Sequence, residues 1–188
     1  MPEIFDIWMR LLRQKEGSIL WLLQSNATAA QNLRREAEAR GVAQERLIFA
    51  PPVPNPEHLA RHQLADLFLD TLPYGAHTTA SDALWMGLPV LTCKGENFQG
   101  RVAASLLSAV GLPEMVTHSF AEYEARALEL AGNPEALATI RAKLLQNRDT
   151  HALFDTVRFT RHLEAAYAVM VERYRNGEPS VSFAVEPR

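Results

Sequence analysis

Short apolar runs alternate with segments of helical periodicity through the first two thirds of the chain. Apolar residues recur at the spacing of one helix face over residues 3–13, which predicts a helix. Apolar runs predict strands, and helical spacing predicts helices between them. The first run, bounded by a glycine and polar residues, is interpreted as a buried parallel strand. The predicted strands are 18–23, 46–50, 66–70, 89–93 and 115–116, and the helices between them are 29–40, 56–63, 78–86 and 99–110.

This alternation is typical of an α/β domain, with a parallel sheet covered by helices on both faces. After residue 119 the pattern changes to helices alone, predicted at 120–131, 134–145 and 154–174. The last helix is long and amphipathic. Residues 177–188 carry proline, serine and charge without periodicity, so we expect a domain over 1–176 and a flexible tail over 177–188.

Composition and charge narrow the class of protein. The 188 residues are 47% hydrophobic and 22% charged, which is typical of a soluble globular domain. A net charge of −3 gives no general attraction to nucleic acid or to an acidic membrane surface. No apolar run is long enough to span a bilayer, and no secretory signal is visible. The single cysteine, Cys93, is interpreted as a strand-end residue and fits a reducing compartment, so a cytoplasmic location is predicted.

The candidate chemistry lies where the strand 66–70 leads through a loop into a helix beginning near His77-Thr78-Thr79. Ligands of such sheets lie beyond the carboxyl ends of the strands, and a helix start offers unpaired N–H groups to a phosphate. Asp82 follows Thr78 by one helical turn, where a carboxylate can accept from ribose hydroxyls. The alternative is local: His77 or Thr78 caps the helix, and Asp82 only complements its dipole.

Other segments add less. Residues 95–101 also join a strand to a helix and are expected at the same ligand edge, as are His58 and His77. The chain has no Gly-x-Gly-x-x-Gly motif and no P-loop, which argues against a nicotinamide enzyme or an NTPase. It has no Asp-x-Asp pair and no His/Cys/Asp cluster at metal-ligand spacing, so neither a metal nor a cofactor is predicted.

These segments resemble the C-terminal catalytic lobe of O-GlcNAc transferases and Spindly-like proteins. The most specific motif is His-Thr-Thr-x-x-Asp-x-Leu-Trp, at residues 77–85. The resemblance implies the GT-B architecture, in which two Rossmann-like lobes enclose the active site, and makes this chain the second, donor-binding lobe. It covers nearly the whole chain except the tail, and includes residues 18–23, 46–49, 58–66, 69–71, 95–96, 101–105, Tyr123, Arg141 and 153–154.

Carried over by position, the motif implies a site for the sugar diphosphate. Thr78 and Thr79 would bind the diphosphate through the helix start. His77 would lie near the sugar and phosphate, and is the one candidate catalytic residue in the chain. Asp82 would hold the ribose, and Tyr74 would approach the sugar pocket.

The uracil end is implied by the same resemblance. His58 would pack on the base, with Arg61 and the backbone near Val53 on its polar edge. Many relatives carry lysine where this chain has Asn55, so that contact to the ribose is weakened or remade. The family also carries a diphosphate-binding lysine, with a glutamine one turn earlier, ahead of the segment that matches Pro2. Neither is present here, so we expect a piece of a longer protein or a truncated relic.

The resemblance implies a glycosyltransferase that moves a sugar, N-acetylglucosamine from UDP, onto protein Ser or Thr hydroxyls without a metal. The first lobe and the tetratricopeptide repeats that hold protein acceptors lie outside this chain, so alone it is expected to be incomplete. Two alternatives stay open. Relatives using GDP-fucose or UDP-glucose differ in the donor, and a non-catalytic module would instead use its exposed last helix, including for homodimerisation.

Overall fold

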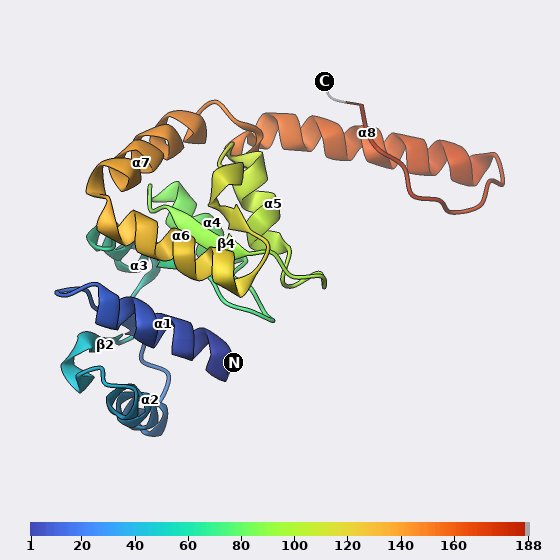
Figure 1. Ribbon diagram of the computed structural model, residues 1–188. Coiled ribbons are helices and arrows are strands. Elements are labelled where there is room, and N and C mark those ends of the chain that lie inside the picture. The colour runs from blue at the N-terminus through green and yellow to red at the C-terminus, as the bar shows by residue number, and fades with distance from the viewer. Residues whose placement is uncertain (187–188) are drawn as a thin grey trace.

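The structure is a computed structural model that describes residues 1–186, and it contains two parallel sheets (Figure 1). In the first, β1 (Leu20–Leu23) pairs with β2 (Leu47–Ala50), with Leu20 opposite Leu47. In the second, the order is β3-β4-β5. Its strands are β3 (Phe68–Leu69), β4 (Val90–Cys93) and β5 (Val116–Thr117). The predicted parallel α/β class is therefore confirmed.

Helices connect the strands as the periodicity predicts. Each predicted helix is present, with ends that differ by up to three residues from those expected. Short 3₁₀ turns at residues 44–46, 62–64, 113–115 and 152–154 extend the connections. The helices are α1 (Pro2–Gln14), α2 (Ala27–Ala39), α3 (Asn55–Arg61), α4 (Thr78–Trp85), α5 (Val102–Ala109), α6 (Phe120–Gly132), α7 (Pro134–Arg148) and α8 (Thr156–Arg175).

The main core forms around β4, which has a neighbouring strand on each side and is buried along its whole length. Leu84 of α4, Leu107 of α5 and Leu130 of α6 pack in this core. Cys93 lies at the end of β4 as predicted, and burial raises the pKa of its thiol. Cys93 is therefore a core residue and a poor nucleophile.

A second, smaller core lies between α1, α2 and the first sheet, and α1 contributes to both cores. Ile4 and Ile7 join the main core, whereas Phe5, Met9 and Leu12 join the smaller one. The two sheets are thus joined through a helix, and no strand in residues 1–186 hydrogen-bonds to both. This differs from the single sheet predicted from the sequence.

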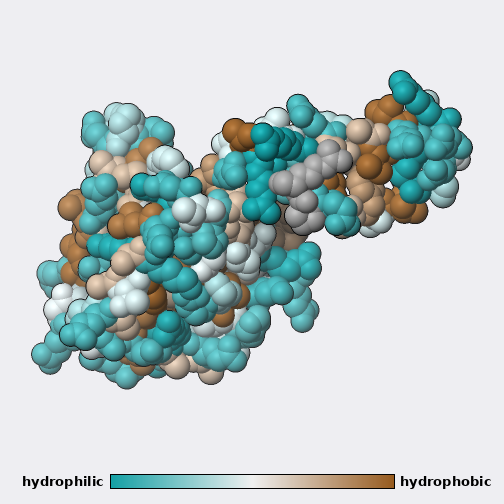
Figure 2. Space-filling view, turned by 90° about the horizontal axis from the view of Figure 1, so that it is seen from above, coloured by the Kyte–Doolittle hydropathy of each residue, from teal (hydrophilic) through white to brown (hydrophobic). Residues whose placement is uncertain are grey.

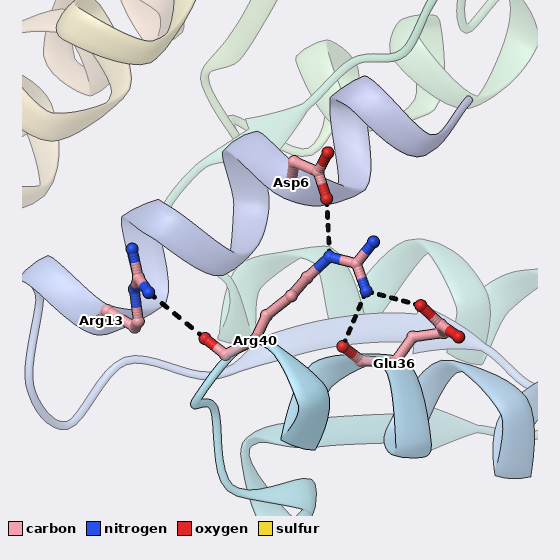
Figure 3. A network of polar contacts seen from close by, with 4 residues as sticks. All are labelled: Asp6, Arg13, Glu36 and Arg40. Carbon is pink, nitrogen blue, oxygen red and sulfur yellow. Dashed lines mark hydrogen bonds and ion pairs between the residues drawn. The ribbon is translucent and has the colours of Figure 1, made fainter.

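Polar contacts fix α1 on its neighbours. The guanidinium of Arg40, just after α2, donates to Asp6 of α1 at 2.6 Å and to the side chain of Glu36 at 2.5 Å (Figure 3). The Arg40 carbonyl accepts a longer bond, 3.4 Å, from Arg13. On the other side, Arg10 donates twice to Glu124 of α6, at 2.7 and 2.6 Å. α1 is therefore tied to both halves of the lobe.

The prediction that residues 18–23 form a buried strand is wrong. Ile19 is 58% exposed and Leu23 is 60% exposed, and the other residues of β1 are only half-buried. The reason is positional: β1 has a hydrogen-bonded strand on one side only, so its apolar run is not enclosed as β4 is.

The last helix, α8, projects from the body as an arm and has no buried residue (Figures 1 and 2). Arg173 contacts the following segment, donating to the Pro179 carbonyl at 3.1 Å and pairing with Glu178 at 3.0 Å. The end of the predicted tail, residues 187–188, lies outside the described residues. Within residues 1–186, none of the helices has the length and apolar character needed to cross a membrane.

Candidate functional site

The predicted corner between β3 and α4 is built around a buried carboxylate. Asp70 directly follows β3, and its Oδ1 accepts the backbone N–H groups of Thr71 at 2.7 Å and Ala76 at 2.6 Å. Its Oδ2 accepts from the Thr92 hydroxyl at 2.7 Å. Burial raises the pKa of Asp70, and the three hydrogen bonds act against that shift. The loop 71–76 is thus folded back on the end of its own strand.

A second loop closes the corner from the β4 side. The backbone N–H of Gly75 donates to the Gln99 carbonyl at 3.2 Å, and His77 Nε2 lies 3.3 Å from the same oxygen. A Cβ atom on Gly75 would lie 3.0 Å from that carbonyl and 3.2 Å from Asp70 Oδ2. Only a glycine leaves this approach undisturbed, so the segment 95–101 reaches the same edge as predicted.

The start of α4 is open. His77 occupies the N-cap position, as the capping interpretation expects, but its side chain makes no capping bond. The first turn begins with Ser81 N–H donating to the His77 carbonyl at 3.1 Å. Thr78 and Thr79 precede it and are exposed, which leaves their N–H groups free for an anion.

The other predicted contacts lie on the connection from β2 to α3. His58 Nδ1 lies 2.7 Å from the Arg61 guanidinium, which also donates to the Pro51 carbonyl at 3.0 Å. Burial lowers the pKa of His58, with further lowering from His62 and Arg61, whereas the charge of Asp82 raises it. The neutral imidazole that results is suited to stacking against a planar ring.

The charge of Asp82 raises the pKa of His58, so the two predicted groups lie within electrostatic range of each other. His58 follows a strand of the first sheet and His77 a strand of the second, so they do not share one sheet edge as expected. The candidate residues instead follow strands of both sheets. Val53 is half-buried ahead of α3, and Asn55 is exposed as the first residue of that helix.

Aromatic side chains surround His77. Tyr74 is 65% exposed and stacks on the imidazole, with ring centroids 5.1 Å apart. Phe98 is 69% exposed and meets the same imidazole edge-on at 6.0 Å. This arrangement places two exposed aromatic rings beside the start of α4, where the family resemblance implies a sugar.

Two contributors were not predicted as site residues. Asp70 organises the loop, and the hydroxyl of Tyr123 donates to the Asp70 carbonyl at 2.9 Å. The only local signal was a carboxylate at the end of an apolar strand. Within residues 1–186, no three His, Cys, Asp or Glu side chains gather in a way that would hold a metal ion.

Comparisons with known proteins agree with this geometry. Residues 1–163 match the model of glycosyl transferase family 41. A probable UDP-N-acetylglucosamine–peptide N-acetylglucosaminyltransferase of Arabidopsis thaliana, SEC, is 38% identical over 98% of this chain and 19% of its own length. The corresponding transferase of Caenorhabditis elegans is 36% identical over 95% of this chain and 16% of its own length.

The fold is similar to a solved mutant O-GlcNAc transferase from Thermobaculum terrenum, with a TM-score of 0.84 and 38% identity. That match covers 90% of this chain and 33% of the solved one. The chain thus spans about a fifth of the length of the curated relatives it matches. Because the family match extends over most of the sequence and the fold agrees with it, the chain belongs to glycosyl transferase family 41.

Proposed function

We propose that this chain is the donor-binding lobe of a GT-B glycosyltransferase. The complete protein would transfer N-acetylglucosamine from UDP-N-acetylglucosamine to Ser or Thr hydroxyls of proteins, with acceptors held by parts outside this chain. The observation that carries the proposal is the uncapped start of α4, which leaves the amides of Thr78 and Thr79 open beside His77. The names of the relatives support the choice of donor and acceptor.

The proposed mechanism of this lobe is electrostatic. The open amides and the partial positive charge of the helix start would neutralise the diphosphate, so this lobe needs no metal for that task. As the bond to the sugar breaks, negative charge develops on the departing diphosphate, and preorganised N–H groups stabilise it. His77, stacked under Tyr74, is the candidate to contact the sugar and the phosphate.

The nucleoside would lie across the gap between the sheets. The neutral ring of His58 would stack on uracil, while Arg61 and the backbone near Val53 would meet its polar edge. Asp82, whose charge raises the pKa of His58, would accept hydrogen bonds from the ribose hydroxyls. The family resemblance implies a lysine at the position of Asn55, so we expect Asn55→Lys to strengthen UDP binding.

Calorimetric titration with UDP tests the proposal. Losing one charge-assisted hydrogen bond costs roughly 1.5–3 kcal/mol, so Asp82→Ala should weaken UDP binding by roughly 10- to 100-fold. Thr79→Pro, which removes one open N–H group, should also weaken it. Asp66→Ala is the matched control, because Asp66 is an exposed carboxylate before β3. Absence of UDP binding by both this chain and the full-length protein would refute the donor site.

The choice of nucleotide is a separate question. Base recognition is expected to depend on residues 53–61, and GDP-fucose and UDP-glucose are the alternative donors. Competition between UDP and GDP for the chain distinguishes the base, and competition among UDP-sugars distinguishes the sugar. Preferential binding of GDP would replace UDP-N-acetylglucosamine by a guanine-based donor without changing the proposed phosphate corner.

The exposed face of α8 favours a second candidate function, an interaction module. Phe159, Leu163 and Tyr167 are 64%, 39% and 56% exposed on one side of this helix, and the projecting arm shows hydrophobic patches (Figure 2). Exposed apolar surface of this kind pairs with another protein surface, here a second copy or the first lobe. Light scattering across concentration should show dimers that Phe159→Ser disrupts and Arg161→Ser does not. Transferase activity of the complete protein would favour the first function.

The proposed cellular compartment is argued from the state of the cysteine and not from a targeting motif. Cys93 is a buried free thiol. An unpaired cysteine fits a reducing compartment, and we propose the cytoplasm. Fluorescence microscopy of the tagged full-length protein tests this location.

A further inference from the structure

The carboxylate of Asp70 is a costly group to bury. The residue is 4% exposed, and removal from water raises the pKa of its carboxyl group. A buried carboxylate is tolerated only when its oxygens receive hydrogen bonds. Both oxygens of Asp70 do so, through Thr71, Ala76 and Thr92. An apolar residue would fill this position at the end of β3 with less cost, so packing alone does not account for an aspartate.

Two of these bonds define the shape of the loop 71–76. The N–H groups of Thr71 and Ala76 lie at opposite ends of the loop, and both converge on the same oxygen, Oδ1. The carboxylate therefore closes the loop into a ring. Ala76 is followed directly by His77 and the open start of α4, so the bond to Ala76 fixes where that helix begins.

Asp70 is itself held from elements distant in the sequence. The hydroxyl of Tyr123, a fully buried residue of α6, donates to its backbone carbonyl at 2.9 Å. Burial raises the pKa of Tyr123, so its hydroxyl remains a donor. Thr92 of the neighbouring strand β4 donates to the side chain. Asp70 is thus contacted from α6 and β4 as well as from its own loop.

We propose that Asp70 is a positioning residue for nucleotide-sugar binding, whose carboxylate holds the loop 71–76 in the shape that presents His77 and the open amides of α4 to the diphosphate. This inference rests on the proposed function. Asp70 acts through the N–H groups that it orients and does not touch the donor.

Three variants distinguish a role of Asp70 in positioning the loop 71–76 from a role in stabilising the fold alone. Asp70→Ala removes all three side-chain bonds. Asp70→Asn keeps the size and one acceptor oxygen for the two loop bonds, which become neutral and about half as strong, while the Thr92 hydroxyl loses its acceptor. Thr92→Val is the matched control, because it removes a buried bond to the same carboxylate and leaves both loop bonds in place.

Two measurements on the 188-residue chain test the proposal: UDP affinity by calorimetry, and hydrogen exchange of the Thr71 and Ala76 amides by NMR. We expect Asp70→Ala to lower UDP affinity by at least about 10-fold and to speed both amides by a similar factor. Asp70→Asn should give an intermediate effect of about 3-fold or more. Thr92→Val should stay within about 2-fold of the unmodified chain, even where its melting temperature falls.

The outcomes are distinguishable. If the unmodified chain and the full-length protein do not bind UDP, the proposed function fails, while amide exchange still shows whether Asp70 holds the loop. If UDP binds and Asp70→Ala binds it equally well, the positioning role is refuted alone. If Asp70→Ala does not fold, the comparison of Asp70→Asn with Thr92→Val decides: equal UDP affinities refute the proposal.

Discussion

Removal of one buried hydroxyl tests whether the support beneath the donor corner has been identified correctly. Tyr123→Phe deletes the donor to the Asp70 carbonyl and the hydroxyl that the buried indole nitrogen of Trp8 faces, whereas the ring, which is fully buried in the main core, remains. Leaving a buried acceptor without its partner costs about 1–3 kcal/mol. For a chain of this size, each kcal/mol lowers the melting temperature by about 2–4 °C. The variant should therefore melt about 2–12 °C lower.

Urea denaturation followed by tryptophan fluorescence measures this loss directly. We expect a lower midpoint with an unchanged slope, since the same surface is exposed on unfolding. Tyr167→Phe is the matched control, because that tyrosine is 56% exposed on α8 and its hydroxyl supports no core element. The control should stay within about 0.5 kcal/mol of the unmodified chain. Equal free energies of unfolding for the two variants would refute the assignment of the buried hydrogen bond.

Three further predictions concern pH and the loop. The folded state keeps the Tyr123 proton above the ordinary pKa of 10.0, where the unfolded state loses it, so stability should fall above about pH 10, and less so in Tyr123→Phe. Identical alkaline slopes in urea denaturation would contradict this. Arg10 lowers the pKa of Glu124, a stabilisation present above pH 4.5 that is lost as pH falls through the lowered folded value. Because Arg10 is 42% exposed, Glu124→Gln should cost less than about 1 kcal/mol at neutral pH and flatten the acid slope of unfolding. Gly75→Ala should weaken UDP binding in calorimetry, whereas Gly132→Ala, with open space around its Cβ position, should leave it unchanged.

The sequence was sufficient to predict the helices and strands, but not to predict which strands are buried. Apolar runs, and the glycines that end the preceding helices, predicted the strands to within a few residues, because both signals are local. Burial of a strand depends on its neighbours, so the run 18–23 looked like the core strand 89–93 although β1 is paired on one side only. The division into two sheets was hidden for the same reason.

The candidate site, too, was predictable only where its residues are adjacent in the sequence. The open helix start at Thr78 and the nearby Asp82 follow from residues adjacent in the sequence. Asp70 could not be assigned this way, because its partners Thr92 and Tyr123 lie 22 and 53 residues further along the chain. A polar residue that ends an apolar strand is ambiguous until the opposing side chains are known.

Because the candidate site spans two sheets, the helix that joins them should influence nucleotide binding from a distance. Arg61 is anchored to the first sheet, through the Pro51 carbonyl and over the ring of Trp21, whereas α4 belongs to the main core. Met9 of α1 is 1% exposed in the smaller core, and Met9→Ala should cost about 2–5 kcal/mol.

Leu144→Ala is the matched control for this prediction, since Leu144 is equally buried but lies in the main core on α7. It should lose similar stability and leave the spacing of the two sheets intact. We therefore expect calorimetry, at a temperature where both variants are folded, to show weaker UDP binding for Met9→Ala than for Leu144→Ala. Equal affinities would mean that the position of α1 does not set the distance between His58 and the open start of α4, and that each half of the site forms independently of the other.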